Sequence, residues 1–148
     1  MRTGFTADVC FVRVIEGMTD ALERQTCELS LMDCLSKSGI VPDEVEINEA
    51  GCFVIVPGAD VGRLKKAFFE LKAAVAPFNA AIRLHEHCGR ILLERTRLRD
   101  ILPPLADIIA ALHRAGICVV HATSAPAAIA LIVDGIHLER AQAVIAAR

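Results

Sequence analysis

Few side chains in this sequence have the types and spacing that catalysis requires. We find no Ser-His-Asp ordering, no glycine-rich phosphate loop and no pair of catalytic carboxylates. The run HEHC is the main candidate for metal chemistry, because His85 and His87 would share one face of a strand. A zinc site usually needs three or four ligands, which only distant residues could complete: His113, His121 or His137. We therefore predict no catalytic residues and no metal, and we interpret HEHC as a solvated strand edge.

The elements that would position any site are arranged in two copies. The stretch LSKSGIVPDEVEINEAGCFVIVPGADVGR (residues 35–63) aligns without gaps on LHRAGICVVHATSAPAAIALIVDGIHLER (residues 112–140), at an offset of 77 residues. The offset pairs Gly39 with Gly116 and Arg63 with Arg140. Matching glycines and arginines are harder to obtain by chance than matching apolar residues, so we interpret the pattern as an internal duplication.

Hydrophobic periodicity predicts the same order of elements in each copy. In the first copy we predict strands over 8–15, 43–47 and 52–56 and helices over 21–37 and 60–75. In the second copy we predict strands over 85–94, 117–122 and 129–133 and helices over 103–116 and 137–147. Residues 77–88 would supply the closing strand of the first copy. Each copy is then a ferredoxin-like βαββαβ unit of the α+β class, an antiparallel sheet with helices on one face.

Composition narrows the class of protein. The chain has 148 residues, 54% of them hydrophobic, which suits a folded chain with a sizeable core. Its net charge is −2 and it has no Trp or Tyr, so we expect no nucleic-acid partner; the arginines near residues 90–99 are diluted by Glu94 and Asp100. The longest apolar run, Ala125–Val133, falls short of the roughly 20 residues that a membrane span needs.

The expected compartment is the cytoplasm, because no signal peptide is visible at the start of the sequence. The six cysteines then read as reduced thiols. Four of them fall at apolar positions of the predicted elements and are expected to behave as small core residues: Cys10, Cys34, Cys52 and Cys118.

Several motifs resemble those of ACT domains, and more narrowly the paired ACT region at the C-terminus of aspartokinases. TGFTADVCFVRV (residues 3–14) is similar to the entry strand of that region, and SGIVPDEV (38–45) and AGICVVHATS (115–124) are similar to its two "GI" segments. RDILP (99–103) resembles the loop before the first ACT helix. The resemblance implies two ACT-type units, residues 1–83 and 84–148, with 1–7 as an entry strand that could pair with the second unit. It implies no kinase portion and no cofactor.

The sequence also departs from that pattern. The Pro-Gly that tightens the loop into the first helix of each unit is replaced by Gln25–Thr26 and by Leu102–Pro103. The asparagine usual after "GI" is replaced by Val41 and Cys118. In the family this loop and strand hold the effector amino acid, so the departures leave open whether one copy, both or neither binds a ligand.

A free amino acid is a zwitterion, so its site needs donors for the carboxylate and acceptors for the ammonium. Eight polar residues lie in the loops that the resemblance marks: Thr19, Asp20, Glu23, Gln25 and Asp43 in the first copy, and Asp100, Thr123 and Ser124 in the second. Each has a structural alternative. Asp20 and Asp100 could cap helices, Thr123–Ser124 could form a turn, and Asp43 could be a solvated charge at a strand edge.

The leading hypothesis is a stand-alone regulatory module that senses a small amino acid such as lysine or threonine. A homodimer formed through ACT–ACT sheet pairing is expected, because small sheets leave edge strands to cover. The alternative is a non-catalytic regulatory subunit, or partner, of a separate biosynthetic enzyme in which ligand binding is lost. A small metal-dependent enzyme built on HEHC is a third hypothesis.

Overall fold

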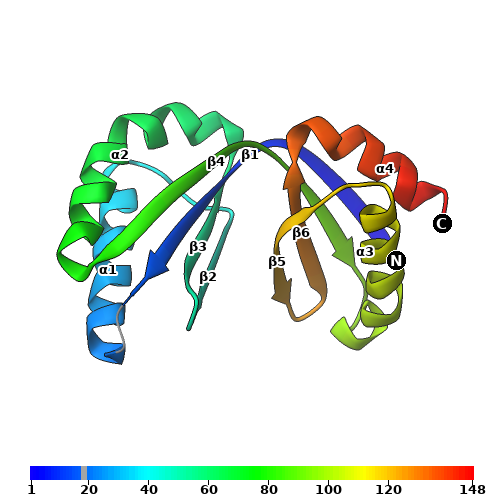
Figure 1. The fold of residues 1–148 in the computed structure, drawn as a ribbon, viewed down its shortest axis with the longest axis horizontal. Coiled ribbons are helices and arrows are strands. Elements are labelled where there is room, and N and C mark those ends of the chain that lie inside the picture. The colour runs from blue at the N-terminus through cyan, green and yellow to red at the C-terminus, as the bar shows by residue number, and fades with distance from the viewer. Residues whose placement is uncertain (18–19) are drawn as a thin grey trace. The chain divides into compact units, whose positions relative to one another are not determined.

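The computed structural model describes residues 1–17 and 20–148 (Figure 1). The strands in this part of the chain are β1 (Arg2–Glu16), β2 (Glu44–Asn48), β3 (Gly51–Val56), β4 (Ala80–Glu94), β5 (Val119–Ala125) and β6 (Ala128–Asp134). The helices are α1 (Ala21–Lys37), α2 (Val61–Val75), α3 (Leu102–Arg114) and α4 (Leu138–Ala146). The predicted fold class is confirmed: α+β, two βαββαβ copies in tandem with antiparallel strand pairing.

Two strands are longer than predicted. β1 begins at Arg2 instead of residue 8, so the entry strand and the first predicted strand are one element. β4 begins at Ala80 and joins the closing strand of the first copy to the opening strand of the second. The two predicted segments, residues 77–88 and 85–94, overlap, and the structure joins them in one strand.

The chain divides into two compact units. We call Cys10–Glu86 the first unit, and Met1–Val9 with His87–Arg148 the second unit. Strands in the first unit run in the order β2-β3-β1-β4, and those in the second in the order β1-β4-β6-β5. The long strands β1 and β4 therefore contribute to both units, and the first nine residues belong with the C-terminal half of the sequence.

The point where each long strand passes from one unit to the other is marked by a left-handed residue. Asp8 and His87 have φ values of 53° and 54°, which is rare outside glycine but least costly for Asp, Asn and His. Such a residue interrupts the alternation of side chains along a strand. The premise that His85 and His87 share one strand face was therefore wrong. Instead His87 lies near Asp8, with Nδ1 and Oδ1 3.8 Å apart.

The core of the first unit lies between the sheet and helices α1 and α2, which cover one face (Figure 1). Antiparallel pairing places Cys10 opposite Val56, Val12 opposite Val54 and Val14 opposite Cys52. These alternate residues point toward the helices and are fully buried, as the period of two predicts. The helices contribute Cys27, Leu31 and Leu35 from α1 and Leu64, Leu71 and Val75 from α2.

The second unit repeats this arrangement with α3 and α4. β4 and β6 supply Ile91, Leu93, Ile129, Leu131 and Val133, and the helices supply Ile108, Leu112, Ala141 and Ile145. Phe5, from the entry segment of β1, packs against this core. Burying a leucine or isoleucine side chain contributes about 1.5–3 kcal/mol, so apolar packing is the main stabilising term in each unit.

Both copies end their first helix with the same cap. Gly39 and Gly116 have φ values of +71° and +73°, the left-handed conformation that glycine commonly adopts after the last turn of a helix. The amide of the next residue then turns back onto the helix: Ile40 N–H donates to Leu35 O at 3.0 Å and Ile117 N–H donates to Leu112 O at 2.9 Å. This equivalence supports the duplication inferred from the sequence.

All six cysteines are free thiols. Cys10 and Cys52 are buried core residues and Cys34 is half-buried, but Cys118 is exposed, because it precedes β5 and lies outside the alternating pattern. Burial raises the pKa of Cys27 to about 11 and that of Cys52 to about 12, and nearby carboxylates add to the effect. In the described part of the chain, no helix is both long enough and apolar enough to cross a bilayer.

Candidate functional site

One end of the second unit gathers charged side chains around a cavity of about 390 Å³. β4 ends there at Glu94, which pairs with Ala128 at the start of β6. A 3-10 turn, Leu98–Asp100, then leads into α3. We call the hollow the β4-end cavity; it is lined by Met1, Arg2, Glu94, Arg95, Thr96 and Asp100.

The β4-end cavity presents both signs of charge. The guanidinium of Arg2 pairs with Glu94, Nε to Oε2, at 3.2 Å. Arg95 is fixed through its backbone, whose N–H donates to Ala127 O at 3.1 Å. Asp100 is half-buried and has Arg99 Nε 4.0 Å from its Oδ1. Arginines can bind a carboxylate through two parallel hydrogen bonds, and the carboxylates can accept from an ammonium group, so the lining matches a zwitterion.

Asp100 does not serve as a helix cap. The residue that precedes α3 is Ile101, and no side chain accepts a hydrogen bond at that cap. The N–H of Ile101 donates to Leu98 O and the N–H of Leu105 donates to Ile101 O, so backbone carbonyls satisfy these amides. Pro103 and Pro104 have no N–H to offer. The carboxylate of Asp100 is therefore available to the cavity, whereas the start of α3 has few free donors.

A second hollow adjoins the β4-end cavity and shares Met1 and Arg95 with it. Its volume is about 420 Å³, and its lining is more apolar, with Phe5, Ile145 and Ala146 among the walls. Together the two hollows offer charged groups beside an aliphatic surface. Small-ligand sites commonly combine an apolar wall with a few charged groups that fix orientation.

Thr123 and Ser124 lie at the same end of the sheet as Asp100 but not at the cavity. They pair with Ala130 and Ile129 of β6, and β5 is the edge strand beyond β6. Two strand spacings separate β5 from β4, about 10 Å in total. The structure therefore brings Asp100 to the cavity and leaves this Thr-Ser pair outside it.

The predicted residues of the first unit do not converge. Asp20 caps α1, its Oδ1 accepting a hydrogen bond from Leu22 N–H at 2.9 Å, which was the structural alternative for this residue. Glu23 and Gln25 are exposed on the first turns of α1. Asp43 precedes β2, whereas β1 ends level with the far end of β2, so Asp43 and Asp20 lie at opposite ends of the sheet. Thr19 lies outside the described residues.

The first unit holds a pair of acidic residues that sequence reasoning missed. Glu16 ends β1 and Glu28 lies on the inner face of α1, 8% exposed. Both carboxyl oxygens of Glu16 are shielded from solvent. Burial and the neighbouring Glu28 carboxyl raise the pKa of Glu16 to about 7, and Arg24 opposes the shift. The offset of 77 residues offered a signal, since it aligns Glu16 and Glu28 with Leu93 and Leu105 of the second core.

In the described part of the chain, no three His, Cys, Asp or Glu residues are placed to hold a metal ion. His85 instead lies beside Phe11, with ring centroids 5.7 Å apart, and Phe11 also stacks on Phe53 at 6.1 Å. His85 is therefore part of an aromatic cluster in the first unit, together with Phe11 and Phe53.

Comparisons with known proteins show which solved structures have a similar fold. No model of a protein family matches the sequence, and no curated protein matches it either. Among solved structures, the regulatory subunit of aspartate kinase from Thermus flavus is similar, with a TM-score of 0.78 at 12% identity over 97% of this chain and 94% of that one. A structure of aspartokinase alpha and beta subunits gives 0.74 at 15% identity, covering 98% and 95%.

Full-length enzymes match over a smaller share of their length. The aspartate kinase of Clostridium acetobutylicum gives a TM-score of 0.77 at 12% identity, covering 97% of this chain but 33% of the enzyme. The architecture is thus that of two ACT-type units in tandem. More narrowly, it is the fold of the aspartokinase regulatory region, matched nearly from end to end, and the resemblance drawn from the sequence motifs is confirmed at the level of fold.

Proposed function

We propose that this chain is a non-catalytic regulatory module that binds a small amino acid in the β4-end cavity. The observation that carries the proposal is the meeting of Arg2 and Arg95 with Glu94 and Asp100 around a hollow of about 390 Å³. The nearly complete match to regulatory subunits of aspartate kinase supports a regulatory role.

The lining suggests how a zwitterion would be oriented. Arg95 would bind the ligand carboxylate, and Asp100 would accept from its ammonium group. The exposed ion pair between Arg2 and Glu94 would open to share both groups with the ligand, a small cost because surface pairs contribute only about 0–1 kcal/mol. An aliphatic side chain would lie in the adjoining hollow, toward Ile145. Lysine and threonine remain the leading candidates for the effector.

Binding in the second unit alone is the stoichiometry we propose. In the first unit Asp20 is used as a helix cap and Asp43 lies at the far end of the sheet. These two positions support loss of ligand binding in the first copy. The alternative hypothesis, in which ligand binding is lost, is thus favoured for the first copy only. One ligand per chain is therefore expected.

The module would act on a separate enzyme. One similar structure contains aspartokinase alpha and beta subunits, that is, separate chains. By analogy we propose a cytoplasmic partner enzyme and a homodimer formed through the free sheet edges β2 and β5. Regulation then requires that the ligand bind two arrangements of the assembly with different affinity, since only differential binding shifts an equilibrium.

Thermal-shift screening of the purified protein against the twenty amino acids tests the proposal, followed by calorimetry with any hit. We expect stabilisation by one or two amino acids, a stoichiometry of one, and loss of the effect in R95Q and D100N. R97Q and D107N are the matched controls, because both residues belong to the second unit, are exposed and do not line the cavity. No shift with any amino acid would favour the alternative, a regulatory partner that has lost its ligand.

A further inference from the structure

Helix α2 concentrates positive charge in an acidic chain. The sequence has four lysines, of which Lys65, Lys66 and Lys72 lie on α2 and Lys37 lies on the last turn of α1. With Arg63, and Glu70 as its only acid, α2 carries a formal charge of +3. Because the whole chain carries −2, the residues outside α2 carry −5. The lysines are thus gathered on one part of the surface.

The second copy shows that the fold does not need these residues. The offset of 77 residues aligns Lys65 with Gln142, Lys66 with Ala143 and Phe69 with Ala146 of α4. Helix α4 packs on its own sheet through Ala141 and Ile145, as α2 does through Leu64 and Phe68. The equivalent helices α2 and α4 therefore differ on their solvent-exposed sides, where packing against the sheet does not restrict the residue type.

The solvent side of α2 is also an unfavourable surface for an isolated helix. Arg63, Lys65 and Lys66 lie in its first half, near the positive end of the helix dipole, where Asp60, the residue before α2, pairs with Arg63 alone. Phe69 is 80% exposed, the fraction expected of a charged residue. Features that do not serve helix stability, and that the second copy lacks, point to an interaction.

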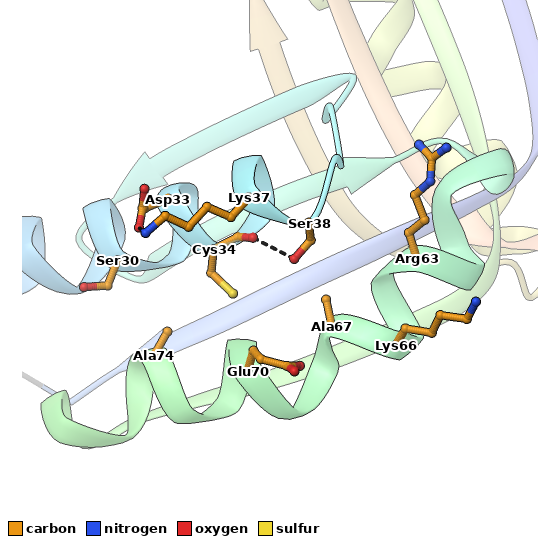
Figure 2. A pocket seen from close by; sticks show the side chains of 10 residues that line it. All are labelled: Ser30, Asp33, Cys34, Lys37, Ser38, Arg63, Lys66, Ala67, Glu70 and Ala74. Carbon is orange, nitrogen blue, oxygen red and sulfur yellow. Dashed lines mark hydrogen bonds and ion pairs between the residues drawn. The ribbon is translucent and has the colours of Figure 1, made fainter.

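A groove of about 680 Å³ runs between α1 and α2 beside this surface (Figure 2). Figure 2 shows Arg63 and Lys66 extending from one end of α2, and Lys37 on α1 with its ammonium group turned back toward Asp33. Small side chains (Ser30, Cys34, Ala67 and Ala74) leave room between the helices for a polypeptide segment. Asp33 and Glu70 also line the groove, so it presents both signs of charge.

The cations hold local partners that a ligand can replace. Lys37 pairs with Asp33 at 2.7 Å, Arg63 with Asp60 at 3.3 Å and Lys65 with Glu86 at 2.8 Å. The cation of each pair is largely exposed, and such surface pairs contribute little to stability. Lys66 makes no ion pair within the part of the chain that the structure describes.

We propose that α2 and the α1–α2 groove form a docking surface for an acidic segment of a partner protein. Lys37, Arg63, Lys65 and Lys66 would bind its carboxylates, and Phe69 would supply the apolar anchor. Aromatic side chains, phenylalanine among them, are enriched at protein interfaces. The inference rests on the proposed function in one respect, that a regulatory module needs a partner chain; the surface belongs to the first unit and the β4-end cavity to the second.

A membrane or a nucleic acid fits this surface less well. Interfacial helices insert a broad apolar face, and the apolar face of α2 is turned to the core through Leu64, Leu71 and Val75. Phe69 is the one large apolar side chain exposed on α2. Asp33 and Glu70 would repel a continuous phosphate backbone, whereas an acidic protein segment can place its carboxylates between them.

The test uses the full chain and a defined probe. A labelled 14-residue peptide with leucine at every third position and glutamate elsewhere is titrated by fluorescence anisotropy at 50 mM salt, and its contacts are mapped by amide shifts in nuclear magnetic resonance spectra. The variant K65Q/K66A/F69A carries the second-copy residues. R114Q/R140Q is the matched control, since it removes two exposed arginines from α3 and α4 and makes the same change in charge.

We expect amide shifts on α2 and around Lys37, at least fivefold weaker binding in the triple variant, and less than twofold change in the control. Binding should weaken as salt rises to 300 mM, because exposed charges are screened. Absence of binding, shifts confined to other elements, or equal losses in both variants would overturn the proposal. So would stronger binding to anionic vesicles or to single-stranded RNA with the same dependence on α2. The triple variant should keep any amino-acid-induced thermal shift, which separates failure of this inference from failure of the proposed function.

Discussion

Glu16 and Glu28 face each other at the end of β1, in the positions where the second copy of the repeat has Leu93 and Leu105. Two carboxyl groups thus stand where the related core has two leucines. Glu16 cannot be charged without cost, because burial and the neighbouring Glu28 carboxyl both raise its pKa. The first unit therefore carries a group that titrates near neutral pH.

The stability of the protein should fall as pH rises through this titration. The pKa of Glu16 is raised from 4.5 to about 7, so the folded state holds a proton that the unfolded state has released. The contribution is fully present below pH 4.5 and is lost between pH 4.5 and about 7. We expect the free energy of unfolding to drop by about 1–2 kcal/mol over this range relative to E16Q. Urea denaturation of both proteins at pH 5 and pH 8 measures the difference, and parallel pH profiles would contradict it.

Restoring the residues of the second copy should stabilise the first unit. In E16L/E28L two apolar side chains replace a buried acidic pair, an exchange that is often neutral or stabilising by about 1–4 kcal/mol. We expect a higher melting temperature at pH 8 and a smaller gain at pH 5. Single E28L is the comparison, since it removes the neighbouring carboxyl that helps to raise the pKa of Glu16. A double variant less stable than the parent at pH 8 would show that the acids are required for packing.

The two left-handed glycines should be equally sensitive to substitution. At both Gly39 and Gly116 an added Cβ would meet nothing within 4 Å, so the cost of alanine is the backbone conformation alone. That cost is about 1–2 kcal/mol for a left-handed residue. G39A and G116A should therefore lower the urea midpoint by similar amounts. A loss confined to one of them would mean that the helix ends differ in a way that the matching cap hydrogen bonds do not show.

Substitutions of Asp20 and Asp100 should have different effects, one on the stability of the fold and the other on amino-acid binding. D20A removes the hydrogen bond to Leu22 N–H and should cost about 1 kcal/mol of stability without changing amino-acid affinity. D100N should leave the melting temperature nearly unchanged, because this side chain caps no helix. The same substitution should lower the affinity for the amino acid. Chemical denaturation and calorimetry on the two variants distinguish these effects. The reverse pattern would assign the ligand to the first unit.

Most helices and strands could be predicted from the sequence because they depend on patterns among neighbouring residues. Alternating residues such as Val12 and Val14, and a glycine such as Gly39 after a periodic helix, leave a clear trace in one dimension. The passage of β1 through Asp8 was missed because a left-handed aspartate leaves almost no trace in a sequence. The site depended on register and strand order, which a sequence does not show. Register places Asp43 and Asp20 at opposite ends of the sheet, and the position of β6 between β4 and β5 separates Ser124 from Asp100. Glu28 was missed because a carboxylate on a helix is normally at the surface.

The sharing of β1 and β4 between the units has a consequence for how the chain is made. Phe5 packs in a core that includes Ile145, a residue 140 positions further along the chain that is therefore synthesised much later. Such pairings between distant parts of the chain form late and slow folding. The entry strand must therefore wait, with its apolar residues uncovered, until the rest of the second unit is complete. Cutting the gene at the repeat boundary would leave that strand attached to the wrong half.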